Sequence, residues 1–588
     1  MRLVLASVTA LAAVAVTMCV TPAFAQLPMT GTHVPELQGV DTLLQNFFVN
    51  KPIPGGTVAI THNDKVVYEL GFGYSDANRT IPMQENALMR LASVSKPVTA
   101  SAIHQLVKDG QLSLNTKAFN ISDNGGILNI APYNGVLGDS RLRDITIGHL
   151  LEHKGGWNRD TAGDLAFRDV QIASQLGVPS PPGIANSARY ILSQPLQVTP
   201  GTASYYSNIG YMFLGMVVEA VSGQSYDNYV DNHVLAPVGI PSWEISTGRT
   251  FAANQNPREP VYSSPNNARN VYDPNGSFVN SPYGGWDHEK AQAYGGLIGS
   301  SKAIAMMAQN RIANGPEIGK LRSDYTTFPT YWWYHTGSLD GTDTLMLQAS
   351  WKDWTYSILF DRRPADGSSY TDSLVNAMQN LLQGIVAWPN ALQYAGDFTE
   401  DQWLTADDIN LFKSARELGS ELAFDQLYPG ARYLAGDFDG NGVVTGLDVP
   451  GMVGALQHAG VPAEYIGLMA DLPGDFNEDN FVDSADYVLW RKNIGSSVYL
   501  PNETVSFGLV DQADYDVWRA NFGTSLIPGS GSMQPSAEPL SSAVPEPATW
   551  VLLISLLTVG CKKTIAPGAI AVRGNLNYTL REVPRPLL

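Results

Sequence analysis

Ser93-Val94-Ser95-Lys96 is the stretch that decides how this chain folds and which chemistry it supports. Residues three apart lie on one face of a helix, so Lys96 is expected beside the Ser93 hydroxyl. A free serine hydroxyl attacks poorly because it holds its proton, and it needs a neighbouring base. A helix N-terminus also favours the negative charge that develops during attack. The stretch therefore predicts a nucleophile, Ser93, at the start of a helix.

Two further motifs follow in the order that such a site needs, Tyr206-Ser207-Asn208 and His335-Thr336-Gly337. Unperturbed lysine and tyrosine titrate near about 10, and burial side by side can bring one of them toward working pH. Lys96 and Tyr206 are therefore the predicted proton-transfer pair. The sequence leaves open which of the two accepts the Ser93 proton.

The three motifs together resemble those of the serine β-lactamase and penicillin-binding-protein superfamily, in its branch of class C β-lactamases, DD-peptidases and esterases. The resemblance covers roughly residues 36–390 and includes Leu150-Leu151-Glu152-His153 and Gly295-Gly296-Leu297. It implies an α+β fold, with an antiparallel sheet flanked by helices, and acyl-enzyme catalysis without a cofactor. The turn Pro200-Gly201-Thr202 favours Tyr206 over Tyr226, which begins a similar triplet.

The resemblance also implies roles for the remaining motif residues. Asn208 would hydrogen-bond a substrate amide or Lys96, and the third motif would form a strand edge that pairs with an extended substrate. The backbone N–H groups of Ser93 and Ser338 would form the oxyanion hole. Many relatives carry lysine where this chain has histidine, which argues against a dedicated β-lactamase. The predicted substrate-binding residues are Asn208, His335, Thr336, Gly337 and Ser338.

The patterns around the motifs predict the framework of the domain. Residues 56–73 alternate as two strands around the turn Asn63-Asp64, and residues 331–360 alternate as further strands. Helices are expected over residues 93–108, about 210–221 and 371–387. Residues 250–290 are rich in Asn, Pro, Gly and Ser, so we expect a surface excursion over the mouth of the site.

Charge is concentrated in one part of this chain of 588 residues. The formal net charge is −19, and residues 396–523 hold 22 acidic and 6 basic residues, a net of −16. Such a local excess argues against a nucleic-acid surface and favours cation binding. The length exceeds one typical domain. The two cysteines, Cys19 and Cys561, lie in terminal apolar segments, so no disulfide is expected in the body between them.

The acidic region repeats a unit that begins Gly-Asp-Phe at residues 396, 436 and 474. The second and third units place oxygen side chains at the spacing of a calcium loop, with a carbonyl at the seventh position, and the first unit fits more poorly. The units resemble dockerin repeats, in small all-α, EF-hand-like modules at residues 396–460 and 474–523. An acidic turn without metal is the alternative. The predicted Ca²⁺ ligands are Asp437, Asp439, Asn441, Val443, Thr445, Asp448, Asp475, Asn477, Asp479, Phe481, Asp483 and Asp486.

Both ends of the chain have the composition of targeting segments. Residues 1–25 form a predicted signal peptide with a small-residue cleavage site at its end. A Ser/Pro-rich linker (524–548), a short apolar segment (549–563) and a tail (564–588) follow the repeats and resemble a PEP-CTERM sorting signal. The apolar run is shorter than the ~20 residues that span a bilayer. We expect an exported bacterial protein, extracellular, periplasmic or at the cell surface, with membrane contact only through its terminal segments.

The sequence thus predicts an exported serine hydrolase, with its catalytic domain at residues 26–390, acting on D-amino-acid peptides, carboxylic esters or β-lactams. One fold hosts all three activities, so the sequence does not choose among them. The alternative is a calcium-dependent cell-surface interaction or scaffold protein with a vestigial hydrolase domain. The presence of Ser93, Lys96 and Tyr206 argues against it. Expected partners are a small-molecule or peptide substrate and a cohesin-like or cell-surface partner of the repeats, but no nucleic acid.

Overall fold

The computed structural model describes residues 27–313, 318–320, 322, 333–349, 354–469, 472–477, 481–497, 500, 502, 505–506 and 509–525. The predicted signal peptide, apolar segment and tail lie outside these residues, as do Asp479 and the linker beyond residue 525. Within the described residues, no helix has the length and apolar character needed to cross a membrane.

A six-stranded antiparallel sheet, in the order β1-β3-β2-β11-β10-β9, is the framework of the N-terminal domain (residues 27–390). Its β2–β3 hairpin turns at Asn63 and Asp64, whose φ angles are 51° and 61°, as the alternating pattern predicted. The edge strand β9 carries the third motif. The strands are β1 (Met29–Gly31), β2 (Gly55–His62), β3 (Lys65–Gly73), β9 (Trp333–Leu339), β10 (Thr342–Gln348) and β11 (Trp354–Phe360).

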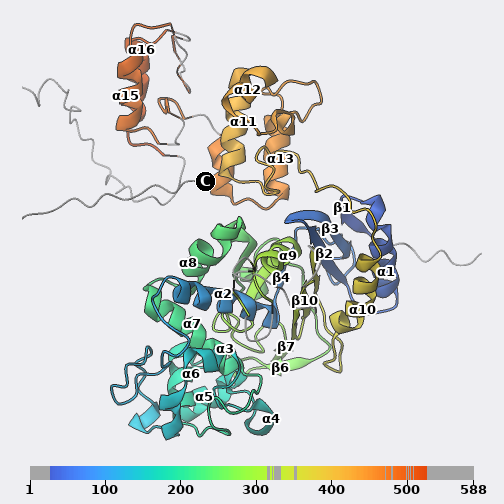
Figure 1. Cartoon of the computed structure of the whole chain (residues 1–588), viewed down its shortest axis with the longest axis vertical. Helices are drawn as coiled ribbons and strands as arrows, with labels where there is room; N and C mark the ends of the chain where they lie inside the picture. Colours follow the sequence, from blue (N-terminus) through green and yellow to red (C-terminus); the bar gives the residue numbers. More distant parts are fainter. Residues whose placement is uncertain are drawn as a thin grey trace, which may run out of the picture. The chain divides into compact units, whose positions relative to one another are not determined.

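Helices cover both faces of this sheet, because its strands bury apolar side chains on both sides (Figure 1). On one face, α1 (Gln38–Val49) and α10 (Tyr370–Gln383) contribute Leu44 and Met378 to a shared core. On the other face, α9 (Ser301–Asn310) packs against β2, β10 and β11. The predicted antiparallel sheet flanked by helices is confirmed.

The larger core lies among the helices around α2 (Ser95–Lys108) and α7 (Asn208–Ser222), which pack against each other. Gly223 closes α7 with a φ of 71°, a left-handed cap that favours glycine. The smaller elements here are α3 (Ile147–Leu151), α4 (Arg159–Ala162), α5 (Asp169–Leu176), α6 (Gly183–Leu192), α8 (Tyr226–Val230) and a second antiparallel sheet of β4 (Leu88–Arg90), β8 (Leu297–Ser300) and β5 (Ile245–Thr247).

Residues 250–290 do not form a purely surface excursion, so that prediction is wrong in part. The segment holds a small hairpin, β6 (Asn267–Arg269) and β7 (Phe278–Asn280), but Tyr262 is buried. The Arg90 guanidinium lies 4.5 Å from the ring centroid of Tyr262, and the Arg90 N–H donates to the Tyr262 hydroxyl at 2.9 Å. Contacts with buried Arg90 therefore hold the segment against the core.

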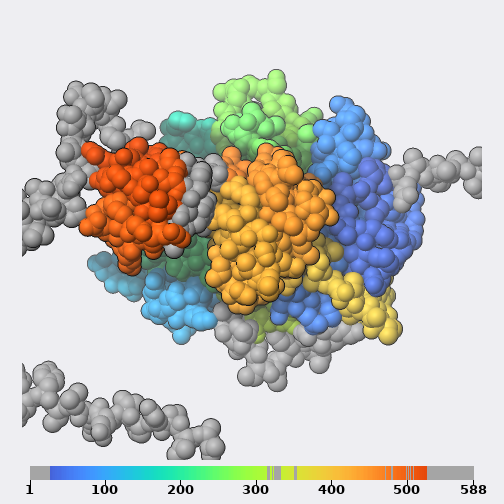
Figure 2. Space-filling model, turned by 90° about the horizontal axis from the view of Figure 1, so that it is seen from above, coloured from blue at the N-terminus to red at the C-terminus, as the bar shows by residue number. Residues whose placement is uncertain are grey.

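Residues 397–469 form a helical body around their own core, which contains Phe398, Phe412 and Phe424. Figure 2 shows its surface in yellow to orange as one compact body. A helix between the first and second acidic loops, α12, was not predicted. The helices are α11 (Ala406–Leu418), α12 (Glu421–Leu427), α13 (Val449–His458) and α14 (Ala463–Ile466).

Residues 472–525 hold a second helical pair, α15 (Ser484–Asn493) and α16 (Gln512–Asn521). The indole of Trp490 donates to the Asp511 carbonyl, and the indole of Trp518 donates to the Asp483 carbonyl, both at 2.7 Å. Each helix thus donates from its tryptophan to the N-cap residue of the other helix, and this symmetric arrangement agrees with the repeat seen in the sequence.

The chain between residues 390 and 405 stays in contact with the N-terminal domain. The Gln402 side-chain oxygen accepts from the Val66 N–H at 2.6 Å, and its amide nitrogen donates to the carbonyls of Val66 and Leu392 at 2.8 and 2.9 Å. Trp403 joins the larger core of the N-terminal domain. The Gln402 side chain therefore satisfies the backbone N–H and carbonyl of Val66 on β3.

Candidate active site

Ser93 lies in the short 3-10 turn Ala92–Val94, immediately before α2, and Lys96 lies in the first turn of that helix. Lys96 Nζ is 3.1 Å from Ser93 Oγ, as the spacing of the two residues predicts. Ala92 has a φ of 46°, a left-handed conformation that is costly for a residue with a side chain. The surrounding structure therefore holds the turn that presents Ser93 in one conformation.

Tyr206 completes a three-residue cluster around the serine oxygen. Its hydroxyl lies 2.6 Å from Ser93 Oγ. The loop that carries Tyr206 is fixed from behind, because the Ser207 N–H donates to Nδ1 of His153 at 3.1 Å. The His153 ring lies 4.6 Å from the Tyr206 ring, and burial lowers the pKa of His153 to about 3. His153 is therefore a neutral support for this loop.

Burial acts on both members of the predicted proton-transfer pair. It lowers the pKa of Lys96 well below its ordinary value of 10.5, although the charge of Asp164 acts in the opposite direction. Burial also raises the pKa of Tyr206 to about 12. Both shifts disfavour charge and so favour the neutral amine of Lys96 and the neutral phenol of Tyr206. Such an amine can donate to the Tyr294 carbonyl, 2.6 Å away, and accept the Ser93 proton.

The third motif lies on β9, where the sheet edge comes close to the serine turn. A Cβ added to Gly337 would lie 2.3 Å from the Leu91 carbonyl oxygen and 2.9 Å from the Ser93 nitrogen, so only glycine permits this approach. His335 is buried, and its Nδ1 lies 2.9 Å from the Thr336 carbonyl oxygen. Burial lowers the pKa of His335 to about 4, so this residue brings no positive charge to the site at neutral pH.

Thr336 and Ser338 are half-buried on the same strand. The Ser338 hydroxyl oxygen is buried and has no hydrogen-bond partner among the described residues. The structure therefore brings the predicted third-motif residues to the strand beside Ser93, and it leaves one polar group there without a protein partner.

Asn208 has a different partner from the one predicted. Its side-chain amide donates to Asp164 at 2.6 Å, so one of its two N–H groups is bound to a carboxylate. Asp164 caps the short turn Leu165–Phe167, which packs against α7. Sequence reasoning missed Asp164 and its neighbour Arg159. The signal that could have found them was the presence of Arg159, Asp160 and Asp164 in the short stretch after Leu150-Leu151-Glu152-His153.

Arg159 lies beside the cluster, with its guanidinium carbon 4.6 Å from the centre of the Tyr206 ring. Its side chain is 46% exposed, and its ion pair is with Asp160 at 4.0 Å, whose side chain is 79% exposed. Among the described residues it makes no hydrogen bond through its guanidinium. The site therefore combines a buried pair of proton-transfer groups with an exposed positive charge.

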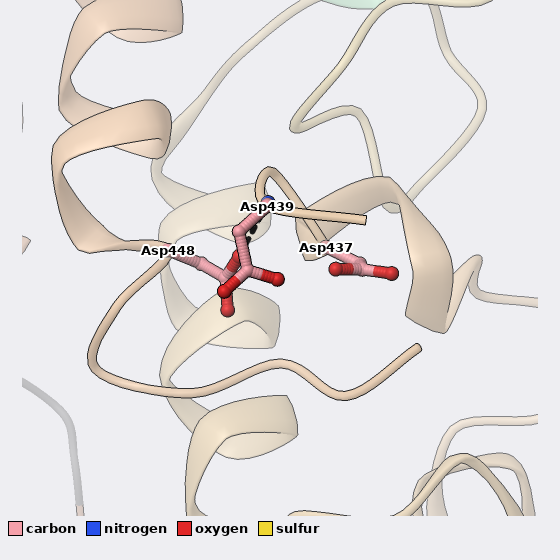
Figure 3. Close-up of side chains that lie close together, drawn as sticks. All are labelled: Asp437, Asp439 and Asp448. Carbon is pink, nitrogen blue, oxygen red and sulfur yellow. Dashed lines mark hydrogen bonds between the residues drawn. The ribbon is translucent and has the colours of Figure 1, made fainter. Parts of the chain in front are cut away.

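The second acidic loop brings three of its predicted ligands together. One carboxylate oxygen each from Asp437, Asp439 and Asp448 lies within 4.8 Å of the others (Figure 3). Asp448 accepts from three backbone N–H groups of the loop, at 2.8 to 3.1 Å. Asn441 donates its amide to Asp439 at 2.9 Å, and Thr445 donates its hydroxyl to Asp448 at 3.3 Å. Val443, the predicted carbonyl ligand of this loop, is 38% exposed.

The third acidic loop is described only in part, because Asp479 lies outside the described residues. Asp475 and Asp486 are fully buried, and Asp483 caps α15 by accepting from the Ala485 N–H at 2.6 Å. The Asn477 N–H donates to Asp486 at 3.0 Å. Phe481 forms a bridge with Ser525.

Comparison with known proteins finds one family. The family model described as Beta-lactamase matches residues 40–372. Protein flp of Staphylococcus aureus strain MW2 is 28% identical over 202 residues, which are 34% of this chain and 36% of that protein. Esterase EstB of Burkholderia gladioli is 28% identical over 204 residues, 34% of this chain and 49% of that protein. The chain thus spans about a third to a half of the length of these curated relatives.

Among solved structures, the octameric penicillin-binding protein homologue from Pyrococcus abyssi is 21% identical, with a TM-score of 0.42 over 59% of this chain and 77% of that one. The D-amino acid amidase from Ochrobactrum anthropi SV3, complexed with L-phenylalanine amide, is 17% identical, with a TM-score of 0.42 over 60% of this chain and 99% of that one.

Proposed function

Because this chain belongs to the beta-lactamase family, we propose that it is a serine hydrolase that forms an acyl-enzyme on Ser93. The observation that carries the proposal is the position of Ser93 Oγ, 3.1 Å from Lys96 Nζ and 2.6 Å from the Tyr206 hydroxyl. A serine held between two groups that can move a proton is the arrangement that nucleophilic catalysis requires.

Lys96 is the proposed proton acceptor during acylation. Since burial favours its neutral form, its lone pair can take the Ser93 proton as Oγ attacks the substrate carbonyl carbon. Tyr206 stays protonated, because its pKa is raised to about 12, and it donates its proton to the departing alcohol or amine. Lys96 then returns a proton to Tyr206. Attack of Ser93 Oγ gives a tetrahedral intermediate with a negatively charged oxygen, and its collapse restores the carbonyl and breaks the bond to the leaving group.

Water completes the reaction in the reverse sense. It adds to the acyl carbon, its proton passes through the same pair to Ser93 Oγ, and the carboxylic acid leaves. We propose that the backbone N–H groups of Ser93 and Ser338 bind the carbonyl oxygen in both steps. The close approach of β9 to the serine turn at Gly337 supports this role. An oxyanion-hole donor contributes ~3 kcal/mol to lowering the barrier.

The proposed substrates are carboxylic esters and D-amino-acid peptides, with β-lactams as the third class. His335 is neutral where many relatives have a cationic lysine, which favours the first two classes. No cofactor is needed for this chemistry, because Ser93, Lys96 and Tyr206 supply every proton transfer.

Covalent labelling tests the proposal. A fluorophosphonate or an acylating β-lactam should add one adduct to the full chain, mapped to the peptide that contains Ser93. Ser93→Ala should abolish labelling. Ser101→Ala is the matched control, because Ser101 lies in the same helix and donates its hydroxyl only to the Pro97 carbonyl at 2.8 Å. An adduct on another serine would overturn the assignment.

We further propose that the second acidic loop binds Ca²⁺, since Asp437, Asp439 and Asp448 converge there and carboxylate oxygens are preferred calcium ligands. Calorimetric titration of the full chain with Ca²⁺ tests this. Asp437→Asn should lower the affinity for Ca²⁺, whereas Asp425→Asn, at an exposed position on α12, should leave it unchanged. Equal titrations of the two variants would contradict the proposal. A cohesin-like or cell-surface partner, and export itself, stay predictions from the sequence.

A further inference from the structure

Arg159 is an exposed cation beside the reacting groups. Its guanidinium lies on the ring of Tyr206, and the hydroxyl of that same tyrosine touches Ser93 Oγ. One aromatic ring therefore separates Arg159 from the nucleophile. Stacking on an aromatic face orients a guanidinium without using its N–H groups, so the fork of donors stays available.

The protein itself does not satisfy this guanidinium. Among the described residues, Arg159 makes no hydrogen bond through its side chain, and its ion pair with Asp160 is long and exposed at both ends. An exposed pair of this kind contributes little to stability, so it does not hold the arginine against a better partner. Arg141 differs, because its guanidinium donates to Asp139 at 2.7 and 3.0 Å.

The other basic groups of the site cannot replace Arg159 as an anion-binding group. Lys96 is fully buried and bound to Ser93 and the Tyr294 carbonyl. His335 and His153 are neutral at neutral pH. Asp164, a carboxylate whose charge acts on Lys96 and Tyr206, is bound to Asn208. The exposed positive charge beside Tyr206 is thus that of Arg159.

The space beside Arg159 limits how an anion can bind. The cavity that Arg159 lines together with Asp164 and Gln197 has a volume of about 20 Å³, enough for roughly one water molecule. This cavity is therefore too small for a carboxylate, which has to approach Arg159 from its exposed side. An arginine fork matches two carboxylate oxygens with two parallel N–H donors.

We infer that Arg159 is a substrate-specificity residue that binds a carboxylate on the substrate, near the scissile carbonyl. The inference rests on the proposed function, since it assigns the substrate class of the same Ser93 site. The preferred substrates are then esters or amides that carry a carboxylate on the acyl part or on the leaving group. Neutral substrates of equal length use the same proton-transfer groups but lack this contact.

Matched esters test the inference on the full chain. In the first pair, para-nitrophenyl butyrate is compared with mono-para-nitrophenyl succinate, which carries a carboxylate on the acyl part. In the second pair, phenyl butyrate is compared with the butyrate ester of meta-hydroxybenzoate, which carries a carboxylate on the leaving group. The readout is the ratio of kcat/KM on the charged and the neutral ester, because any effect of Arg159 on Tyr206 cancels in that ratio. Arg159→Gln should lower the ratio about tenfold to a hundredfold in at least one pair.

Controls separate charge from structure. Arg159→Lys keeps the charge but loses the fork, so its ratio should fall between those of the parent and Arg159→Gln. Arg189→Gln removes an exposed arginine from α6 and should leave both esters unchanged. An unchanged ratio in both ester pairs of Arg159→Gln overturns the inference but leaves the serine hydrolase intact. If the parent protein shows no ester turnover that depends on Ser93, the proposed function is overturned instead.

Discussion

Replacing Gly337 by alanine is the sharpest perturbation of the site that the structure offers. The added Cβ would lie 2.3 Å from the Leu91 carbonyl oxygen, 2.4 Å from Thr344 Oγ1 and 2.9 Å from the Ser93 nitrogen. Ordinary contacts begin at 3.4 Å, and two of these three atoms belong to the backbone. Relief therefore requires β9 to move away from the serine turn by about 1 Å, a displacement that can cost about 10²-fold in rate.

We expect Gly337→Ala to lower kcat/KM on a short-chain ester by about 10²-fold or more. Overpacking should also lower the free energy of unfolding by about 1 to 3 kcal/mol. Gly295→Ala is the matched control near the same turn, because its Cβ would approach other atoms no closer than 3.8 Å. Ester kinetics and a thermal melt of both variants provide the measurement. If Gly337→Ala keeps the kinetics and stability of Gly295→Ala, the close approach of β9 is wrong.

Three further predictions follow from contacts already described. Lys96→Ala and Tyr206→Phe should each lower the acylation rate by about 10²-fold or more, measured by stopped-flow with a chromogenic ester, and normal rates in both would exclude them as the proton-transfer pair. The pH profile of kcat/KM should rise as Lys96 loses its proton and level off well below pH 10.5, because burial lowers the pKa of Lys96; a rise that continues toward pH 12 would identify the Tyr206 phenolate as the base. Gln402→Ala should lower the free energy of unfolding of the full chain by about 1 to 3 kcal/mol, because the Val66 N–H loses its partner, whereas Gln84→Ala, at an exposed glutamine whose side chain donates to the Pro82 carbonyl at 3.1 Å, should leave ester hydrolysis and stability close to the parent. Equal melts of the two glutamine variants would show that Gln402 does not fix β3.

Local patterns predicted the framework of the N-terminal domain well. The β2–β3 hairpin and the helix after Ser93 depend on residues close in sequence, so turn chemistry and periodicity were sufficient. Tyr262 was missed for the opposite reason. Its burial depends on Arg90, 172 residues earlier, and no local pattern contains that contact.

The same distinction applies to the site. The spacing of Ser93 and Lys96 predicted their contact directly, and the resemblance supplied Tyr206. Asp164 and Arg159 were missed because their partners, Asn208 and Tyr206, lie more than 40 residues away along the chain. The direction of the Lys96 and Tyr206 pKa shifts also needed the structure, since burial is their largest cause.

The central claim, an acyl-enzyme on Ser93, is tested most directly by trapping the intermediate itself. The full chain is mixed with a reactive ester, quenched in acid within one turnover and analysed by intact mass and peptide mapping. We expect one acyl group, on the peptide containing Ser93, that forms and decays at rates consistent with turnover. Turnover without any acyl adduct, or turnover that persists in Ser93→Ala, would contradict the account.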